Sequence, residues 1–408
     1  MSPFNSFTTG KGAEKRQNRS FPVTQQSATH FATQAASIQL PSYPPQPLPP
    51  PNGPAPYRFD LSSLLSAADL AAIEKAGKIV FHTVGDTGDY RGRQQDFVAA
   101  LMTADAAALP DTEKPAFLYH LGDVVYFAGD IDKYGDNFYE TYKEYPAFIV
   151  AIPGNHDCQP DDPQDGPVDP TKVPLDGWVQ NFMSTTPAQQ GSLKTGAGRT
   201  QMDLPFVYWT FTTPFATIIG LFSNVGETEA YFDQTQIDWF HGELQAASPN
   251  LPIIVTVHHP PFSGDTEHSG STVCDSTLNA AFQATGRYPH LILSGHVHNY
   301  QRFTLETKDN NQQPIQISYV VAGAGGYTNL GTLHKIKGKY PKAPLTLENG
   351  LTLEQYDQTN FGFLRLEIDN QTIIGSYFSA PYQVSSVPTG TLVESFSINI
   401  ANRTVKTL

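Results

Sequence analysis

Apolar residues along this chain gather in short runs that are separated by longer amphipathic stretches. Runs of three or four apolar residues are typical of strands that are buried on both faces of a sheet. Five such runs lie at residues 79–81, 116–119, 147–150, 253–255 and 291–293. Since helical patterns lie between them, the sequence predicts alternating strands and helices over most of the chain.

Polar and apolar residues at helical spacing predict five helices. The first begins at Ser66, which forms a capping-box pattern with Asp69, and ends at Gly77. The other four cover residues 94–107, 136–145, 233–247 and 277–285. Asp233 and Gln236 occupy the N-cap and N3 positions of the fourth helix, which strengthens that prediction.

Three segments rich in threonine, isoleucine and aromatic residues predict β-hairpins, at 206–224, 361–379 and 395–405. Asp369 and Asn370 supply the turn of the second hairpin. Buried strands together with hairpins favour an α/β, or mixed α+β, fold. We expect a four-layer αββα sandwich, in which two mixed β-sheets lie face to face and helices flank them on the outside.

The first 56 residues follow a different pattern. They show no hydrophobic periodicity, and residues 41–56 are rich in proline, which favours an extended and solvated chain. We therefore predict a disordered or loosely draped Pro-rich tail over residues 1–56 and a folded domain over residues 57–408. Hydrophobic residues make up 39% of the chain, and the shortfall lies largely in the tail, so the domain can bury a sizeable core.

The net charge of the chain disfavours one class of binding partner. The formal net charge is −14, which argues against a nonspecific nucleic-acid surface. No apolar run is long enough to span a membrane, and residues 1–20 lack the apolar core of a secretory signal. The sequence thus predicts neither nucleic acid nor membrane as a partner, and it leaves the cellular location and the oligomeric state open.

The chain has two cysteines, Cys158 and Cys274. Two are too few for a disulfide scaffold or a zinc ribbon. Each follows a histidine by a few residues, His156 in one case and His268 in the other. A disulfide would form if the two loops faced each other, but our interpretation is that these are two unrelated thiols.

Polar residues follow the ends of all five apolar runs. They are Asp86, Asp123, Asn155 with His156, His258, and the pair His296 and His298. In an open α/β sheet, ligands bind beyond the carboxyl ends of the strands. We therefore expect these side chains to meet in one crevice, where the glycine before four of the five motifs allows a sharp exit of the chain.

The residue types in this crevice favour a two-metal site. Two cations about 3.5–4 Å apart can hold the attacking and leaving oxygens of an in-line displacement. Asp123 is the natural carboxylate to bridge them, and His296 and His298 can point to different cations. Each motif alone is explained by a turn or a polar loop, but all five in order favour an enzyme that hydrolyses phosphate esters.

With these motifs the chain resembles the calcineurin-like metallophosphoesterase superfamily and, within it, the purple acid phosphatases. Most of the superfamily carries Asp-x-His in the first motif, where this chain has Gly88, and Gly-Asp-x-x-Asp in the second, where it has Tyr126. Loss of that histidine and gain of the tyrosine is the purple acid phosphatase pattern. Segments 295–302, 322–326 and 361–368 are also similar to that group, so the resemblance covers roughly residues 78–378.

The resemblance implies a ligand set for each cation and a dinuclear site at the carboxyl ends of the strands. It assigns Asp86, Tyr126 and His298 to a ferric ion, Asn155, His258 and His296 to a divalent ion (Zn, Fe or Mn), and Asp123 to both. Phenolate and carboxylate are hard anionic donors, which agrees with a trivalent ion, and a ferric tyrosinate is coloured. It also implies that His156 contacts the substrate phosphate. His268, ten residues after His258, is the candidate general acid; the alternative is a solvated loop histidine.

The expected function is that of an acid phosphatase: attack of a metal-bound hydroxide on monoesters of small molecules at an Fe(III)–M(II) centre. Family members are often secreted. Three alternatives remain at this stage. The chain could be a phosphodiesterase or nucleotide pyrophosphatase of the same superfamily, a binding or scaffold protein without turnover, or a divalent-only enzyme in which Tyr126 is not a ligand.

Several other polar residues lie in the motifs or close to them in the sequence. We interpret His82 and His120 as buried, packed or hydrogen-bonded histidines and His259 as a neighbour of the ligands. Tyr300 and Arg302 are expected to support the last motif rather than to line the pocket. Tyr90 is a rival phenolate whose spacing matches no known motif. Four acidic residues, Asp161, Asp162, Asp165 and Asp169, could discourage highly anionic substrates, but solvation alone is the commoner explanation of such a group.

Overall fold

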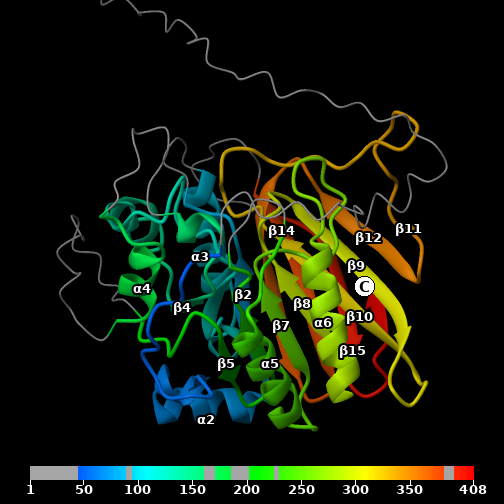
Figure 1. Cartoon of the computed structure of the whole chain (residues 1–408), viewed down its shortest axis with the longest axis horizontal. Helices are drawn as coiled ribbons and strands as arrows, with labels where there is room; N and C mark the ends of the chain where they lie inside the picture. The colour runs from blue at the N-terminus through cyan, green and yellow to red at the C-terminus, as the bar shows by residue number, and fades with distance from the viewer. Residues whose placement is uncertain (1–44, 89–93, 160–170, 185–201, 225–228, 381–389) are drawn as a thin grey trace, which may run out of the picture.

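The computed structural model describes residues 45–88, 94–159, 171–184, 202–224, 229–380 and 390–408. These residues form two β-sheets (Figure 1). The first, in spatial order, consists of β1 (Arg58–Asp60), β5 (Trp209–Thr212), β6 (Thr217–Leu221), β7 (Ile253–Val257), β8 (Leu291–Ser294), β10 (Pro314–Ala322), β9 (Tyr300–Lys308), β12 (Leu351–Asp357) and β11 (Leu345–Thr346). The second consists of β16 (Val405–Thr407), β15 (Thr391–Asn399), β14 (Thr372–Ala380), β13 (Phe361–Asp369), β2 (Lys78–Val84), β3 (Phe117–His120) and β4 (Phe148–Ala151).

Both sheets are mixed, with a parallel part and an antiparallel part. In the first sheet β6, β7, β8 and β10 run parallel, and β9, β11 and β12 extend it antiparallel. In the second sheet β2, β3 and β4 run parallel, and β13 to β16 continue it antiparallel. The predicted mixed fold is therefore confirmed, and the parallel strands bring several carboxyl ends to one edge.

The helices cover the outer faces of this pair of sheets. They are α2 (Ala67–Ala76), α3 (Gln94–Ala108), α4 (Asp176–Phe182), α5 (Gln234–Ala246) and α6 (Thr272–Thr285), with 3-10 turns η2 (Leu61–Ser63), η3 (Asp111–Glu113), η4 (Ile131–Lys133) and η6 (His156–Cys158) and a π-helix, η5 (Gly135–Tyr139). Helices α5 and α6 lie over β7 and β8 of the first sheet (Figure 1), where Phe240 and Phe282 join its apolar residues. Helix α3 packs on the second sheet through Val98 and Met102.

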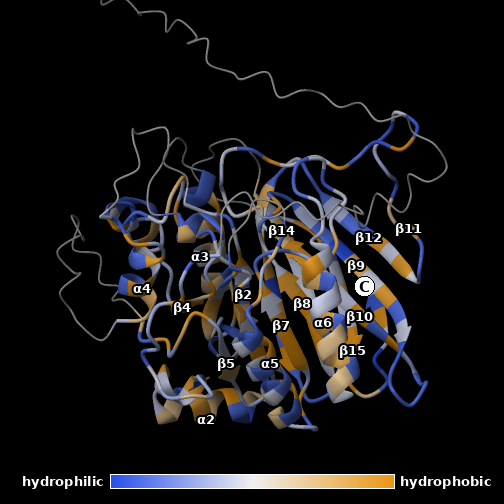
Figure 2. Cartoon of the chain, in the orientation of Figure 1, coloured by the Kyte–Doolittle hydropathy of each residue, from blue (hydrophilic) through white to orange (hydrophobic). Residues whose placement is uncertain are grey.

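Aromatic residues fill the space between the sheets. Phe117 of β3 stacks on Phe81 of β2 at 4.6 Å and meets Phe211 of β5 edge-on at 5.0 Å. The hydroxyl of Tyr119 and Oγ1 of Thr256, from opposite sheets, are 2.9 Å apart. Figure 2 shows the hydrophobic colour on central strands such as β7 and β8, whereas β9 and β12 also carry white and blue stretches. Burial on both faces explains why these strands are short continuous apolar runs.

Most predicted elements agree with the structure. The predicted helix start and stop at Ser66 and Gly77 are confirmed, because Ser66 caps α2 and Gly77 ends it with a φ of 73°. The side chain of Asp233 accepts the N–H of Gln236 at the start of α5. The hairpins β5–β6, β13–β14 and β15–β16 are confirmed, and α6 begins five residues earlier than predicted, at Thr272 after the cap Ser271.

The predicted helix over residues 136–145 is wrong in type and length. A π-helix occupies Gly135–Tyr139 and is followed by turns. Phe138, Tyr139 and Tyr142 are all buried in the core. Positions i, i+1 and i+4 share one face of an α-helix as well, so the apolar pattern of this segment does not distinguish the two helix types.

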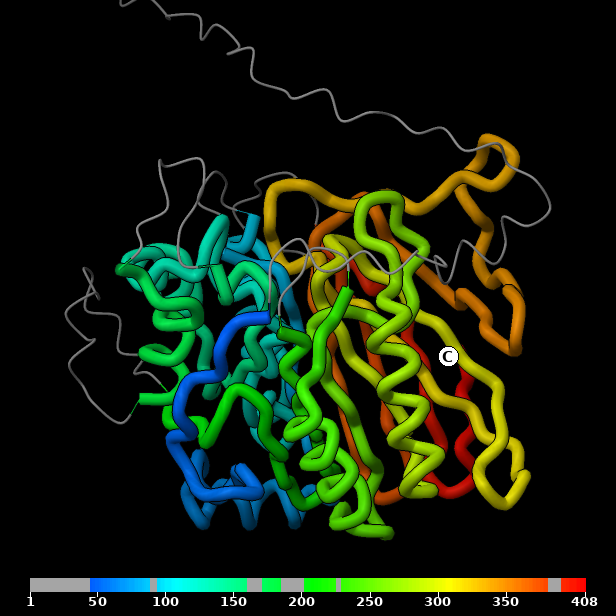
Figure 3. Tube along the Cα trace, in the orientation of Figure 1, coloured from blue at the N-terminus to red at the C-terminus, as the bar shows by residue number. Residues whose placement is uncertain are grey.

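Residues 45–56 are the described part of the predicted tail. They run beside the segment that leads into β5 (Figure 3), and the N–H groups of Asn52 and Gly53 both donate to the carbonyl of Pro205 at 2.9 Å. Leu48 packs against the core. Residues 1–44 lie outside the described part, so the proposed boundary at residue 57 remains a prediction.

The two cysteines are free and buried, and they belong to different apolar clusters, Cys158 in η6 to one and Cys274 in α6 to the other. The interpretation as two unrelated thiols is confirmed. Within the described ranges, no helix combines the length and the apolar character needed to cross a membrane.

Candidate metal centre

The predicted site residues lie at the edge where strands of both sheets end. Asp86, Asp123 and Asn155 follow β2, β3 and β4 of the second sheet within four residues, and His258 and His296 follow β7 and β8 of the first sheet within two. Because the parallel strands of the two sheets end at the same edge, their loops meet there. Each of these residues, together with Tyr126 and His298, is at most 7% exposed.

Asp86, Tyr126 and His298 form one cluster of donor atoms. The phenol oxygen of Tyr126 is 3.2 Å from Oδ1 of Asp86 and 3.3 Å from Nε2 of His298. Nε2 of His298 lies 3.7 Å from the same Asp86 oxygen. Three donors from three separate loops therefore converge within the space that one cation would fill. We refer to them as the Tyr126 set.

Asn155, His258 and His296 form a second cluster. Oδ1 of Asn155 is 3.1 Å from Nε2 of His258 and 3.0 Å from Nδ1 of His296. The other ring nitrogen of His258 contacts the carbonyl of Leu121 at 2.8 Å, so this carbonyl fixes the ring with Nε2 turned towards the cluster. We refer to these three residues as the Asn155 set.

Asp123 joins the two sets. Its Oδ2 lies 2.8 Å from the phenol oxygen of Tyr126 and 3.3 Å from Nε2 of His258, one residue from each set. Its Oδ1 accepts the backbone N–H of His156 at 2.8 Å. Asp86, Asp123 and His258 each offer a donor atom within 4.8 Å of the others, so these three alone could hold a metal ion.

The backbone at this edge is held in an uncommon conformation. Asp86, Asp123 and His296 have φ angles of 59°, 53° and 67°, in the left-handed region that costs side-chain-bearing residues about 1–3 kcal/mol each. The N–H of His296 donates to both carboxylate oxygens of Asp86, at 3.0 and 2.9 Å. A Cβ on Gly154 would lie 2.1 Å from Oδ1 of Asp123, so only glycine fits there. A cluster of residues with strained backbone conformations is typical of a functional site.

Asp157 ties two of the loops together, a role that its position in the motif did not reveal. Its carboxylate accepts the N–H of Val124 at 3.0 Å and of Gly154 at 2.8 Å. Val124 follows Asp123 and Gly154 precedes Asn155. Burial raises the pKa of Asp157 most, and the neighbouring Asp123 carboxylate raises it further, to about 7. The carboxylate thus fixes the shared ligand relative to the Asn155 set.

The electrostatics of the site favour cations. Burial raises the pKa of Tyr126, and Asp123 and Asp86 raise it further. Burial lowers the pKa of His296 and of His298, and neighbouring histidines add to this effect, so both imidazoles are neutral donors. Burial opposes ionisation of Asp123, but His258, His156 and the hydrogen bonds from His258 and Tyr126 together outweigh it and lower the pKa of Asp123. Carboxylates, a phenol and imidazoles that are buried together are the donors that transition-metal ions select.

His156 and His268 border the two sets. Nδ1 of His156 lies 2.7 Å from the carbonyl of Phe127, which leaves Nε2 for a ligand. The ring of His268 lies 4.8 Å from that of His296 and 5.1 Å from that of His298. His268 is half-buried, and its backbone N–H donates to Asp265 at 3.0 Å. Burial lowers the pKa of His268 to about 4, with His156 contributing in the same direction and Glu267 opposing it.

The remaining predicted residues lie outside the two sets. His259 packs on His296 at 4.2 Å and bonds Ser223 at 2.7 Å, as expected for a neighbour of the ligands. His82 and His120 are buried and hydrogen-bonded, as interpreted from the sequence. The side chains of Tyr300 and Arg302 bond Glu394 of β15 and do not meet the candidate ligands. Tyr90 and the four acidic residues at 161, 162, 165 and 169 lie outside the described residues.

Two features of the site were not predicted from the sequence. Tyr327, which follows β10, stacks on Tyr126 with 4.0 Å between the ring centroids. Asn299 and Gln301 form a buried hydrogen-bonded network with Ser263 and Asp265, which holds the loop that carries His268. The amide side chains of Asn299 and Gln301 follow the ligand motif and could have indicated a hydrogen-bonded network. Only the fold shows which loop they hold.

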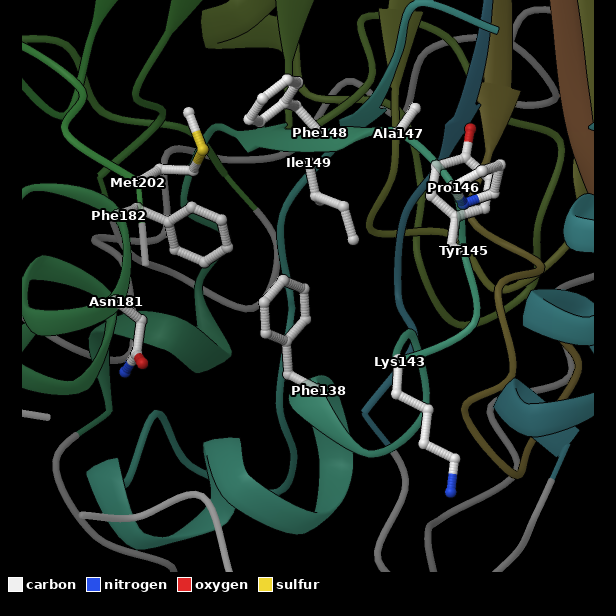
Figure 4. Close-up of a pocket in the computed structure, with 10 residues that line it drawn as sticks. All are labelled: Phe138, Lys143, Tyr145, Pro146, Ala147, Phe148, Ile149, Asn181, Phe182 and Met202. Atoms are coloured by element: carbon white, nitrogen blue, oxygen red, sulfur yellow. The ribbon is translucent and has the colours of Figure 1, made fainter. Parts of the chain in front are cut away.

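A separate pocket of about 360 Å³ lies at β4, the last strand of the second sheet (Figure 4). Its walls include Phe138, Phe148, Phe182 and Met202, with Lys143 and Asn181 as polar members. None of the candidate ligands lines it. Most of its lining is apolar, so this pocket does not have the chemistry of the metal centre.

The comparisons with known proteins agree with this geometry. Residues 79–300, more than half of the chain, match the model of the Metallophos family, described as calcineurin-like phosphoesterase. The matched range includes every candidate ligand. Among curated proteins, none matches the chain.

Three solved structures share the fold. A purple acid phosphatase (PPD1) from yellow lupin (Lupinus luteus) seeds superposes with a TM-score of 0.54 at 17% identity, over 79% of this chain and 54% of the lupin chain. PhoD superposes with a TM-score of 0.54 at 11% identity, over 81% of this chain and 72% of PhoD. GAP50, described as the anchor in the inner membrane complex of Plasmodium, gives a TM-score of 0.52 at 12% identity, over 78% of this chain and 89% of GAP50. The chain thus spans about half the length of the lupin protein, and these likenesses concern the fold alone.

Proposed function

Since the chain belongs to the calcineurin-like phosphoesterase family, we propose that it is a metal-dependent acid phosphatase that hydrolyses phosphate monoesters of small molecules. The observation that carries the proposal is the position of Asp123, whose Oδ2 lies within 3.3 Å of one donor atom from each set. A carboxylate oxygen shared in this way is what two adjacent cations require, because it screens their mutual repulsion.

The donor sets support different cations. The phenol and carboxylate of Tyr126 and Asp86 are hard anionic ligands, so the Tyr126 set would hold a trivalent ion, Fe(III). The amide oxygen of Asn155 and two imidazoles would hold a divalent ion, such as Zn, Fe or Mn, in the Asn155 set. When bound, the cations supply a water of lowered pKa and offset the charge of the phosphate.

The side chains around the sets would bind and protonate the substrate. His156 is positioned by its bond to the carbonyl of Phe127, and its Nε2 would donate to a phosphate oxygen. His268 would give its proton to the leaving oxygen. Because burial lowers the pKa of His268 to about 4, its protonated form is abundant only in acid, which supports an acid optimum.

Two other functions are compatible with the fold. A phosphodiesterase or nucleotide pyrophosphatase would use the same donors, and the chain could instead act as a scaffold, since GAP50 is described as an anchor. The donor set argues against a scaffold, because the burial of seven polar side chains at one place costs stability that a protein without catalysis would not need to lose. The metal donors are the same for hydrolysis of monoesters and of diesters, so residues outside the two sets select between these substrates.

The test combines metal analysis with two substrates. The purified protein should contain iron and a second metal, absorb visible light, and hydrolyse p-nitrophenyl phosphate faster than bis(p-nitrophenyl) phosphate at acidic pH. Asp123→Asn, which nearly keeps the size of the side chain, should lose both metals and the activity together. A protein that binds no metal, or that prefers the diester, would contradict the proposal.

A further inference from the structure

We infer that Tyr327 is a positioning residue for the Tyr126 set, an inference that rests on the proposed function. The backbone N–H of Tyr327 donates to the carbonyl of Asp86 at 3.0 Å. Its ring stacks on Tyr126 at 4.0 Å, with 27° between the planes, and lies 4.7 Å from the ring of His298. One residue thus contacts all three members of the set.

The stack fixes the direction of the Tyr126 ring. Tyr327 packs on this ring at 4.0 Å and His156 at 4.5 Å, so aromatic neighbours restrict its rotation. Its phenol oxygen has to remain within 2.8–3.3 Å of Asp123, Asp86 and His298, a tolerance that a freely turning ring would not meet. An aromatic pair of this kind contributes about 0.5–1.5 kcal/mol beyond its buried area.

Two glycines bring Tyr327 to this place. A Cβ on Gly325 would lie 2.1 Å from the carbonyl oxygen of Gly85, and one on Gly326 would lie 2.4 Å from the backbone of Gln95. The N–H of Gly325 donates to the carbonyl of Gly85 at 3.1 Å. The chain after β10 can therefore approach the Asp86 loop only because these positions lack side chains.

The selectivity of the contact makes the inference testable. Among the described ring contacts, Tyr327 meets Tyr126 and His298 and none of the histidines in the Asn155 set. Loss of its ring should therefore loosen one cation and leave the other. A purely structural role would weaken both sets together.

The experiment compares Tyr327→Leu with Tyr327→Phe in the full-length protein. With Leu, the cation of the Tyr126 set should be lost to a chelator about tenfold faster and the visible band should shift or weaken, while the second metal is retained. With Phe, which keeps the stack, both properties should remain as in the wild type. Tyr377→Leu is the control, because it removes a remote stack of the same kind, 3.8 Å from Tyr300.

Equal loss of both metals in Tyr327→Leu, or loss of neither, would overturn the inference. A crystal structure of the metal-free Leu variant gives an answer that does not depend on any metal. The phenol oxygen of Tyr126 should then lie beyond hydrogen-bonding distance of Asp123, and an unchanged distance would equally overturn the inference. If the wild-type protein binds no metal, the proposed function fails. The crystal structure of the Tyr327→Leu variant still decides whether Tyr327 positions Tyr126.

Four lysines, Lys335, Lys337, Lys339 and Lys342, stand within eight residues, and no Asp or Glu occurs between Asp309 and Glu348. The chain carries a net charge of −14, so all other residues together carry −14 − 4 = −18. The four side chains are exposed, and none forms an ion pair with a described residue. We call residues 335–342 the lysine hairpin.

The lysine hairpin is attached to the rim of the metal centre. Reciprocal backbone hydrogen bonds of 2.8 and 3.1 Å between Ile336 and Lys339 close its turn. On the side of the site, the N–H of Gly331 donates to the carbonyl of His298 at 2.9 Å, and the N–H of His334 donates to Gly264 at 2.8 Å. Lys335 follows four residues after Gly331, at most about 14 Å along the chain. Figure 3 shows this connection, in orange, along the edge at which β7 and β8 end.

We propose that the lysine hairpin binds the leaving group of substrates that carry further negative charge, namely polyphosphorylated small molecules. This proposal deepens the proposed function. Four ammonium groups that form no ion pair with a described residue, one of which (Lys335) lies 4.9 Å from the centre of the Tyr340 ring, create a local positive potential on an otherwise acidic protein. Such a potential at the rim of a site raises the affinity and the capture rate of anionic ligands rather than the rate of the chemical step.

Direct binding provides the test. Calorimetry should show that the triple variant Lys335→Gln, Lys337→Gln and Lys339→Gln binds inorganic tripolyphosphate about tenfold more weakly at low salt, with orthophosphate binding changed less than twofold. The matched control replaces Lys75, Lys114 and Lys143, which precede β2, β3 and β4 at the opposite edge of the second sheet and so change the net charge equally. Equal effects of the two triple variants, or no loss for tripolyphosphate, would overturn the proposal. If orthophosphate does not bind the wild-type protein, the failure is that of the proposed function.

Discussion

The phenol oxygen of Tyr126 lies 2.8 Å from Oδ2 of Asp123. In the absence of a cation the phenol keeps its proton and donates it to the carboxylate, because burial and the nearby carboxylates raise the pKa of Tyr126. A cation in the Tyr126 set has to displace this proton. Binding should therefore release a proton and strengthen as the pH rises, until the metal itself is hydrolysed.

Replacement of Tyr126 by Phe should remove the colour and weaken the metal. The ring would still stack on Tyr327 and His156, so the fold should be retained. Loss of a direct ligand should lower metal affinity by at least the roughly 10–100-fold that outer-shell substitutions cause. Absorption spectra and metal analysis of the purified variant measure this effect, and a coloured Tyr126→Phe protein would show that the phenol is not a ligand.

Replacement of His268 by Ala should separate substrates by their leaving groups. If His268 protonates the leaving oxygen, alkyl phosphates should lose about 10²–10⁴-fold in kcat, whereas p-nitrophenyl phosphate, whose leaving group is already a weak base, should lose far less. The pKa of His268 is lowered to about 4, so wild-type activity on alkyl phosphates should fall as the pH rises above that value. Equal losses for both substrates would remove the proposed role.

Replacement of His290 by Gln should make the protein less sensitive to acid. Burial, with the nearby Arg403, lowers the pKa of His290 to about 3. Between about pH 6.5 and 3 the unfolded chain binds a proton at this residue and the folded chain does not, so the free energy of unfolding decreases as the pH falls, by up to about 1.4 kcal/mol per pH unit.

Urea unfolding of the metal-free proteins at pH 7 and pH 4.5 measures this difference. His120, whose pKa burial also lowers to about 3, contributes equally in both proteins, so the comparison isolates His290. The wild type should lose more stability than His290→Gln on acidification. Parallel losses would mean that His290 is protonated in the folded state.

Replacement of Glu394 by Ala should destabilise the fold strongly without changing the metal donors. Glu394 accepts from Arg302 at 2.9 and 2.7 Å and from the hydroxyl of Tyr300 at 2.6 Å, and the ion pair is almost fully buried. Removal of one partner from a buried pair costs about 3–5 kcal/mol. The double variant Arg302→Met and Glu394→Leu should recover most of this loss in denaturant unfolding, and a single variant as stable as the wild type would contradict the interpretation.

The sequence was sufficient where local patterns decide the structure. The apolar runs marked the buried strands, because strands covered on both faces cannot alternate. Ser66, Gly77 and Asp233 marked helix ends, because caps act over three or four residues. The convergence of Asp86 and His296 also followed from the sequence, because both follow parallel strands that end at one edge.

Other features depend on contacts between distant segments. The antiparallel pairing of β9 with β10 and β12 was not predicted, although Asp309-Asn310-Asn311 after β9 and Asn349-Gly350 before β12 are turn signals. The π-helix at Gly135–Tyr139, whose Phe138 and Tyr139 rings pack into the core, was not predicted. Tyr327 lies outside the ligand motifs, and only the path of the chain through Gly325 and Gly326 brings it to Tyr126.

The proposed ligands come from both sheets, and the N–H of His296 in one sheet already bonds the carboxylate of Asp86 in the other. Each cation would therefore cross-link the two sheets. Chelation would remove the catalytic metals and this cross-link at the same time. Thermal stability, resistance to protease and activity should therefore be lost together. In an enzyme whose ligands all come from one sheet, loss of the metals could abolish activity without weakening the contact between the sheets.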